Sequence, residues 1–328
     1  MSIRPAVGVS RLPRERMSLV TKVARMYHEQ GLRQPEIAER LHLSQSRVSR
    51  LLKEAVTLGV VRTVVIPPPG VHPELEDAIR DLYSLADVVV ADTTDDDDEA
   101  SIISALGAAG AAYLETTLSA TDRVGLSSWS ATLLATADAM TPRANRIAHE
   151  VVQVIGGVGN PSVQVSATRL TDRFARVTGA EPKFFHAPGV VGSKAARDAL
   201  MDDDYIRDLT DEWKNLGVLL AGIGSVSPST LLAASGNTLS EADLGRMREA
   251  GAVGDVCLRY FDANGEPIVT DLDSRVVGIS REDLRAVPRK IGIAGGARKY
   301  EAIHGAVRGG WIDVLVTDLA TARRLVED

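Results

Sequence analysis

Apolar residues recur three and four positions apart in two short segments of residues 34–53, which is the spacing of one helical face. The apolar positions are Ile37, Ala38 and Leu41 in the first segment and Val48, Leu51 and Leu52 in the second. Pro35 suits the first turn of a helix, and Ser44 suits the cap before the second helix. His42 occupies the turn, where histidine tolerates a left-handed backbone better than most residues do. The pattern predicts two helices that close on each other.

The polar positions of the second segment form a row of cations and hydrogen-bonding groups without a carboxylate. A helix with such a face fits the major groove of DNA, with its first residues against base edges. We therefore predict a helix-turn-helix, an all-α unit with or without a short wing strand. The predicted DNA contacts are Gln34, Ser44, Gln45, Ser46, Arg47, Ser49, Arg50 and Lys53. The alternative is a small helical hairpin with a solvated face.

Charge divides the chain into two parts and favours the DNA interpretation. Residues 1–66 carry 12 Lys and Arg against 5 Asp and Glu, a net charge of +7, whereas the whole chain carries −7. The rest of the chain is therefore strongly acidic, at −14. A basic head on an acidic body indicates a polyanionic partner for the head alone.

The pattern changes after the run Pro67–Gly70, which marks a stiff spacer. Near-continuous apolar runs now alternate with helical patterns, beginning with an amphipathic helix at 72–85. The expected strands are 86–92, 122–128, 150–157, 183–188, 216–224, 288–296 and 312–318. Such alternation predicts a mostly parallel sheet with helices on both faces, a Rossmann-like α/β domain. A β-hairpin is expected around Asn264-Gly265.

These patterns predict three parts. The DNA-binding domain takes residues 1–66, with a further helix at about 15–29 and a strand or wing at 60–66. A proline-rich linker takes residues 67–72, and an effector and oligomerisation domain takes residues 73–328. One apolar stripe beside the linker is a candidate contact between copies of the chain; it consists of Leu75, Ile79 and Leu82.

Several classes of site are disfavoured by composition and motif. The lone Cys257 permits no internal disulfide, which fits a reducing compartment, and we expect it to be a packed strand residue. The run Asp95–Glu99 is better placed at a helix start than around a metal. No glycine turn matches a P-loop or dinucleotide fingerprint, and no membrane-length apolar run or secretory signal is evident. We assign no catalytic residue, metal or cofactor, and expect a cytoplasmic protein without a membrane partner.

Small residues cluster where five of the predicted strands end, which is where open parallel sheets bind ligands. The clusters lie at 125–128, 156–159, 187–189, 222–225 and 295–299. Backbone N–H groups in such turns bind anions, and Lys299 adds a positive charge. Together they favour a phosphorylated small ligand.

The same runs resemble a known family. The N-terminal run LVTKVARMYHEQGLRQPEIAERLHLSQSRVSRLLKEAVTLGVV is similar to the DNA-binding head of SorC-type bacterial transcriptional regulators. Their sugar-binding domain is matched in order by VVQVIGGVG, FFHAP, LAGIGSV, GAVGDVCLRYFDANG, RVVGIS and IAGGARKYEAIHGAVRGGWIDVLVTDLATA. The resemblance implies a sensor domain similar in fold to sugar-phosphate isomerases and deaminases. It also implies dimers or tetramers that respond to phosphorylated sugars or related metabolites.

The resemblance further implies an effector site. The predicted residues are Gly125, Ser127, Ser128, Trp129, Gly156, Gly157, Asp255, Gly295, Gly296 and Lys299. Many family members have Ser-Trp-Gly-x-Thr after the second strand. This chain has Ser-Ser-Trp-Ser-Ala-Thr at 127–132, with an extra residue and no glycine, so that wall of the pocket differs.

The leading hypothesis is a transcriptional regulator whose operator affinity is controlled by a phosphorylated sugar or polyol. Its expected partners are double-stranded operator DNA, the effector and further copies of the chain. The alternative is a sugar-phosphate isomerase- or deaminase-like enzyme fused to a DNA-binding head. Paired acid and base groups, which such proton transfers need, are not evident in the sequence. The effector, the operator, the sign of regulation and the choice of dimer or tetramer stay open.

Overall fold

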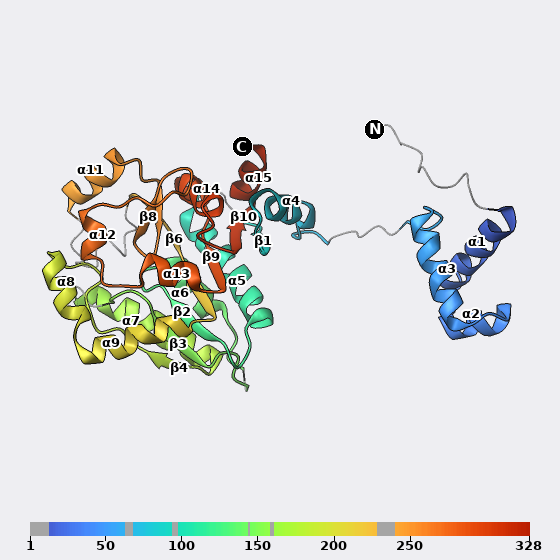
Figure 1. Cartoon of the computed structure of the whole chain (residues 1–328), viewed down its shortest axis with the longest axis horizontal. Coiled ribbons are helices and arrows are strands. Elements are labelled where there is room, and N and C mark those ends of the chain that lie inside the picture. Colours follow the sequence, from blue (N-terminus) through green and yellow to red (C-terminus); the bar gives the residue numbers. More distant parts are fainter. Residues whose placement is uncertain (1–12, 63–67, 94–97, 144, 158–160, 228–239) are drawn as a thin grey trace. The chain divides into compact units, whose positions relative to one another are not determined.

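The computed structural model describes residues 13–62, 68–93, 98–143, 145–157, 161–227 and 240–328. The chain divides into two compact units, Met1–Pro67 and Pro68–Asp328. The division falls inside the proline run from which the linker is predicted. Figure 1 shows the three helices of the first unit and the α/β architecture of the second.

The first unit is built from helices α1 (Arg14–His28), α2 (Gln34–Leu41) and α3 (Gln45–Thr57), so the predicted helices are confirmed. Their apolar faces share one core; it contains Val20, Val23, Ala24, Met26, Ile37, Ala38, Val48, Leu51, Leu52 and Ala55. His42 ends α2 in the left-handed region at φ 53°. Residues 60–62 form no strand, and the rest of the predicted wing lies outside the described residues.

The second unit is organised around a sheet of seven strands that is parallel throughout. The strands are β1 (Asp87–Ala91), β2 (Arg123–Leu126), β3 (Glu150–Gln153), β4 (Glu181–Lys183), β5 (Val218–Ala221), β9 (Arg289–Ile293) and β10 (Val314–Asp318). Their order is β1-β10-β9-β5-β2-β3-β4. The chain leaves β2 toward β3 and returns to β5 on the other side of β2, so the direction of winding reverses there.

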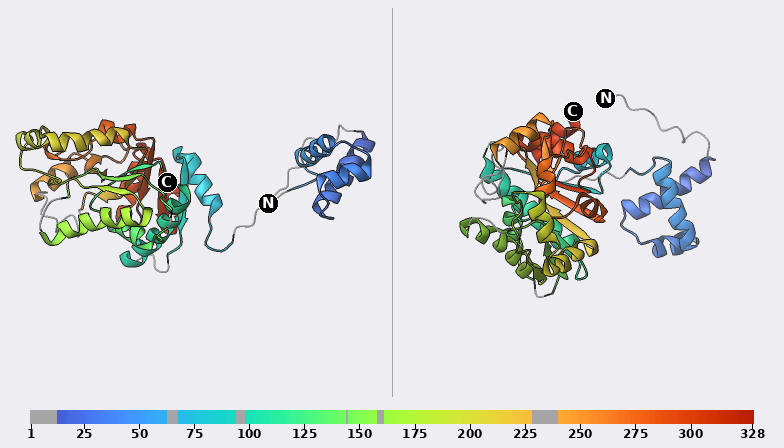
Figure 2. Two further views of the ribbon diagram at one scale, coloured as in Figure 1. Left: turned by 90° about the horizontal axis from the view of Figure 1, so that it is seen from below. Right: turned by 60° about the vertical axis from the view of Figure 1, so that its left-hand side comes forward.

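Helices cover both faces of this sheet, as predicted (Figure 2). One face packs against α5 (Glu99–Thr117), α6 (Ala131–Ala139) and α7 (Pro161–Thr178). The other face packs against a larger set; it comprises α4 (Pro73–Tyr83), α9 (Asp204–Asp211), the 3-10 helix η2 (Glu212–Asn215), α13 (Arg281–Ala286), α14 (Tyr300–Arg308) and α15 (Leu319–Glu327). The remaining described helices are α8 (Lys194–Met201), α11 (Glu241–Glu249), α12 (Asp271–Arg275) and η3 (Ala297–Lys299). No helix among the described residues is long and apolar enough to cross a membrane.

Two predicted strands differ from the structure. The expected strand 183–188 is wrong, because β4 ends where it was expected to begin. The chain turns inward there: the Phe185 N–H donates to Gln153 Oε1 at 2.7 Å, and its ring packs edge-on against Trp213. The expected strand 216–224 divides at Gly222, after which the chain enters a second sheet.

The second sheet is small and antiparallel, with β6 (Ile223–Ser225), β7 (Gly254–Val256) and β8 (Arg259–Phe261) in that order. The hairpin turn between β7 and β8 is Cys257-Leu258, and both residues have positive φ, 55° and 59°. The predicted hairpin around Asn264-Gly265 is also present: the Asp262 N–H donates to the Glu266 carbonyl at 3.0 Å, and Phe261 forms an antiparallel bridge with Pro267. The hairpin turn at Cys257-Leu258 was not predicted. Cys257 is buried as expected but lies in the turn, not in a strand.

The stripe predicted as a contact between copies largely serves the core of its own unit. Ile79 is fully buried, and Leu75 packs against the same core. Only Leu82 is free for a partner, with 58% of its surface exposed. The helical spacing therefore reflects the packing of α4 on the sheet.

Candidate DNA-binding surface and effector pocket

The outward face of α3 is polar and accessible. Gln45, Ser46, Arg47, Arg50 and Lys53 are exposed, and Ser49 is half-buried. Within residues 13–62, no ion pair engages any of the three cations of this face. All three charges therefore remain available to an external anion.

The one carboxylate of α3 is engaged by an arginine of α1. Glu54 accepts two hydrogen bonds from the Arg16 guanidinium of α1, at 2.9 and 3.0 Å. The hydrogen bonds from Arg16 lower the pKa of the Glu54 carboxyl. This pair joins α1 to α3, and the Arg16 charge offsets a carboxylate that would otherwise repel DNA.

The start of α3 is fixed by its cap. Ser44 Oγ accepts the Arg47 N–H at 3.3 Å and lies 3.1 Å from Ser46 Oγ. Ser44, predicted both as a cap and as a DNA contact, is thus confirmed as the cap. Gln34 is half-buried at the start of α2.

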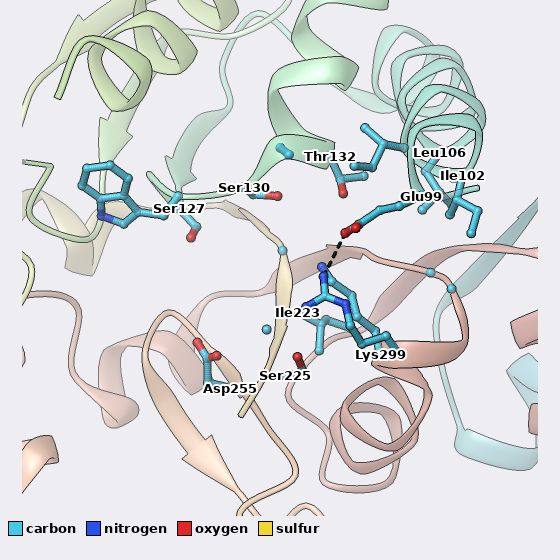
Figure 3. Close-up of a pocket in the computed structure, with 18 of the residues that line it drawn as sticks. Glu99, Ile102, Leu106, Ser127, Ser130, Thr132, Ile223, Ser225, Asp255 and Lys299 are labelled. Carbon is cyan, nitrogen blue, oxygen red and sulfur yellow. Dashed lines mark hydrogen bonds and ion pairs between the residues drawn. The ribbon is translucent and has the colours of Figure 1, made fainter. Parts of the chain in front are cut away.

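A cavity of about 380 Å³ lies at the carboxyl ends of β2, β5 and β9 (Figure 3). This is the point where the winding of the sheet reverses, which is the usual ligand position in open α/β sheets. Its volume falls within the range of small-molecule sites. The wall is completed by the first turns of α5 and α6, by η3 and by the β6–β7–β8 sheet.

One side of the cavity is the N-terminus of α6. Ser130 caps the helix, with its Oγ accepting the Leu133 N–H at 3.2 Å. The N–H groups of Ala131 and Thr132, the first two residues of the helix, have no partner inside it. Both residues line the cavity, so the positive end of the helix dipole lies at its wall.

Two cations of η3 line the cavity, and they differ in whether a carboxylate among the described residues engages them. Arg298 donates to Glu99 Oε1 at 2.8 Å, a contact that Figure 3 marks with a dashed line at Glu99. The Lys299 ammonium forms no hydrogen bond or ion pair with the part of the chain that the structure describes. Burial lowers the pKa of Lys299, and the neighbouring Arg298 charge acts in the same direction. Lys299 is thus the cation that an anionic ligand would neutralise.

Asp255 on β7 supplies a buried carboxylate from the opposite wall (Figure 3). Its Oδ2 accepts the Leu258 N–H at 2.9 Å, which closes the hairpin turn. Burial raises the pKa of Asp255 to about 6, although the Lys299 charge opposes this shift. Gly224 faces Asp255 on β6, and any Cβ there would collide with the carboxylate.

A buried arginine that we did not predict supports this hairpin. Arg259 follows the turn, and its Nε donates to the Ile279 carbonyl at 2.9 Å. Its Nη1 donates to Asp273 Oδ1 at 3.0 Å, and its Nη2 to the Gly278 carbonyl at 3.3 Å. These bonds hold a turn whose two positive φ angles are costly for side-chain-bearing residues.

A buried aspartate, also not predicted, fixes the loop after β9. Asp318 Oδ2 accepts the Gly296 N–H at 2.7 Å, and Oδ1 accepts the Thr321 N–H at 2.9 Å. A Cβ on Gly295 would collide with the same carboxylate, and Gly296 has φ 90°. The double glycine therefore lets the loop approach Asp318. The only feature of the sequence that could have indicated this role is an aspartate three residues before a threonine at a helix start.

Six of the ten predicted effector residues line the cavity; they are Ser127, Trp129, Asp255, Gly295, Gly296 and Lys299. The other four, Gly125, Ser128, Gly156 and Gly157, do not line it. Ser128 Oγ donates to the Ile155 carbonyl at 3.0 Å, which turns it away from the cavity. The glycines at 125 and 156 are packing positions, because a Cβ would enter Leu216 or the Pro188 backbone.

Part of the wall was not among the ten predicted effector residues. Ile102 and Leu106 of α5 form an apolar side, and Ser225 and Thr132 add hydroxyls. Helical apolar spacing alone cannot separate such a wall from the core face of the same helix. The pocket combines an apolar side with a few convergent polar groups, as ligand sites do.

No cluster of three metal-ligating side chains occurs within the described ranges. Asp98 caps α5, and its carboxylate accepts the Ser101 N–H at 2.8 Å, as expected for a helix start. Residues 95–97 of the acidic run lie outside the described part.

Comparisons with known proteins agree with this architecture. Residues 70–327 match the family model "Putative sugar-binding domain", and residues 13–57 match that of sigma-70 region 4. The chain is 33% identical to the deoxyribonucleoside regulator of Bacillus subtilis, over 97% of this chain and 100% of the relative. It is 29% identical to the sorbitol operon regulator of Klebsiella pneumoniae, over 94% and 98%.

The solved structure of that full-length sorbitol operon regulator, SorC, is similar over 94% of this chain and 98% of that one, with a TM-score of 0.72 and 28% identity. The fold and the two surfaces define a DNA-binding transcriptional regulator with a sugar-binding domain. The chain belongs to the SorC-type family of such regulators. The relatives described above are named as regulators, not as enzymes.

Proposed function

We propose that this regulator changes its operator affinity when a phosphorylated sugar or polyol occupies the cavity at the ends of β2, β5 and β9. The observation that carries the proposal is the Lys299 ammonium, which has no partner among the described residues and faces the same cavity as the N-terminus of α6. A cation and free helical N–H groups together are a recurrent phosphate site. Asp255 stands opposite and suits sugar hydroxyls, which donate hydrogen bonds to carboxylates.

The remaining wall fits the carbon skeleton of such a ligand. Ile102 and Leu106 offer apolar contact to C–H groups, while Ser127 and Ser225 add hydroxyl groups nearby. The proposed pose places phosphate against Lys299, Ala131 and Thr132, with the hydroxyls directed toward β7.

On the DNA side, Gln45 and Arg47 of α3 would reach base edges, and Arg50 and Lys53 would meet phosphates. This assignment follows from the position of the first residues of a recognition helix. The accessibility of this face and the pairing of the Glu54 carboxylate with Arg16 support the assignment.

Such heads usually bind paired half-sites as two-fold dimers, so we include self-association in the proposal. A dimer or tetramer would bring two α3 helices to one operator. Light scattering at micromolar concentration tests this point, and a monomer with and without ligand would contradict it.

The cavity belongs to residues 68–328 and α3 to residues 1–67, so a ligand signal must pass between the two units. Tyr300 directly follows Lys299, and its ring stacks on His304 at a centroid distance of 5.8 Å. His304 in turn meets Tyr83 edge-on at 5.8 Å. Tyr83 ends α4, the first helix after the linker. This aromatic series is a contiguous route from the ligand to α4.

The enzyme alternative gains one argument from the structure. Asp255 and Lys299, both with pKa values shifted by burial, face one cavity, and such pairs serve proton transfer. Incubation of the full chain with a panel of sugar phosphates separates the two functions. Thermal stabilisation without turnover supports the regulator, because a ligand that binds the native state raises its stability. Turnover that Asp255→Asn abolishes would support the enzyme.

A further inference from the structure

Four charged side chains among the described residues line the cavity, and their formal charges cancel. They are the carboxylates of Glu99 and Asp255 and the cations of Arg298 and Lys299. Arg298 is engaged by Glu99, so the described wall offers a ligand one unengaged cation. We propose that Glu99 is a specificity-determining residue, which restricts the pocket to ligands with one phosphate and disfavours bisphosphates. This inference rests on the proposed function.

The Glu99 carboxylate is not needed for its own helix. Asp98 caps α5 by accepting the N–H groups of Ala100 and Ser101, at 3.4 and 2.8 Å. The Glu99 side chain instead extends to Arg298 of η3, which lies 199 residues further along the chain. Figure 3 marks this contact of Glu99 with a dashed line. Glu99 therefore competes with any anionic ligand for the Arg298 guanidinium.

A first phosphate is served by Lys299 and by the N–H groups of Ala131 and Thr132. A second phosphate on the same ligand would find its nearest cation in Arg298, the residue before Lys299. To use it, the ligand must displace Glu99, whose negative charge then remains at the rim and repels the ligand. Both side chains of the pair are partly exposed, 69% for Glu99 and 47% for Arg298, so water screens part of this repulsion. We therefore expect a selectivity of tens of fold.

The substitution Glu99→Gln removes the charge and keeps the shape of the side chain. Inorganic phosphate and pyrophosphate are suitable probes, because they differ in the number of phosphates and carry no sugar. Isothermal titration calorimetry of the full-length protein, at constant ionic strength, should show at least a tenfold gain in pyrophosphate affinity in Glu99→Gln. Affinity for inorganic phosphate should change less than threefold.

Glu301→Gln is the matched control. Glu301 is also an exposed carboxylate paired with an arginine, Arg324 at 3.2 Å, but it does not line the cavity. An equal gain in this control, or an unchanged ratio of the two affinities in Glu99→Gln, would overturn the inference. A parent protein that binds both probes, with Lys299→Ala binding them equally well, would refute the phosphate site itself. If no variant binds either probe, the phosphate site and this inference fall together.

Discussion

The two proposed functional surfaces of this chain use charge in opposite ways. The α3 face displays three exposed cations that no described carboxylate engages, all within seven residues of sequence. The pocket gathers two cations and two carboxylates from elements spread over residues 99–299, and their formal charges cancel. The first surface suits a long polyanion whose phosphates are contacted many times. The second suits a small ligand, because each of the four charges affects which ligand can bind.

The largest expected effect is on the exposed surface. The double substitution Arg47→Ala, Arg50→Ala should weaken operator binding by about 3 kcal/mol, because it removes a base contact and a phosphate contact. Fluorescence anisotropy with the operator measures this loss. Arg25→Ala is the control, since it removes an exposed arginine of α1 that pairs with Glu29. Equal affinity of the double variant and the parent would remove α3 as the recognition helix.

The second largest effect is expected on folding stability, which the buried Asp255 carboxylate lowers. The pKa of Asp255 is about 6 in the folded protein and near 3.8 when the carboxyl is not buried. A raised carboxyl pKa means that folding stability is lost as pH rises through this window and stays lost above it. Asp255→Asn should therefore stabilise the ligand-free protein by about 2 kcal/mol above pH 6, and have little effect below pH 4. Thermal melts across this pH range test the claim, and a difference independent of pH would contradict it.

A smaller effect should separate binding from signalling. His304→Ala removes the ring between Tyr300 and Tyr83, and should reduce the ligand response of operator affinity by about 1 kcal/mol. Ligand affinity in the absence of operator should stay close to that of the parent. His186→Ala is the matched control, because it removes an imidazole that lies 6.1 Å from Phe184, outside the cavity wall. Equal loss in both variants would show that the route through α14 has no special role.

The smallest effect is expected at Lys53. Lys53→Ala should weaken binding to operator and to random DNA alike, by less than about 1 kcal/mol, and should reduce the salt slope by about one. Titrations at several salt concentrations measure that slope. A selective loss for the operator would instead assign Lys53 to a base contact.

The same contrast explains what the sequence could predict. Helices α2 and α3 and the cap of α3 depend on residues close in sequence. The apolar periodicity and Ser44 were therefore sufficient to predict them. The parallel sheet follows from apolar runs of strand length. Lys299 and Asp255 were found through glycine turns and a family resemblance, yet their burial and their shared cavity depend on the packing of the whole unit.

The missed and wrong predictions have tertiary causes. The hairpin turn at Cys257-Leu258 was missed, whereas the turn at Asn264-Gly265 was found, because two non-glycine residues with positive φ are unfavourable and give no turn signal. That conformation is held by tertiary bonds from Arg259, which no short window of sequence reveals. Gly125 and Gly156 follow the pattern of a binding turn but are small because neighbouring atoms leave no space for a Cβ. Glycine at a strand end therefore indicates close approach, of ligand or of protein.

The central claim is that the ligand acts through Lys299 in the pocket and not at the DNA surface. The most direct measurement is a titration of a preformed protein–operator complex with the sugar phosphate that gives the largest thermal shift. The Lys299→Ala variant should bind the operator as tightly as the parent, yet require at least tenfold more ligand to change that affinity. A Lys299→Ala complex that responds at the same ligand concentration as the parent would contradict this account.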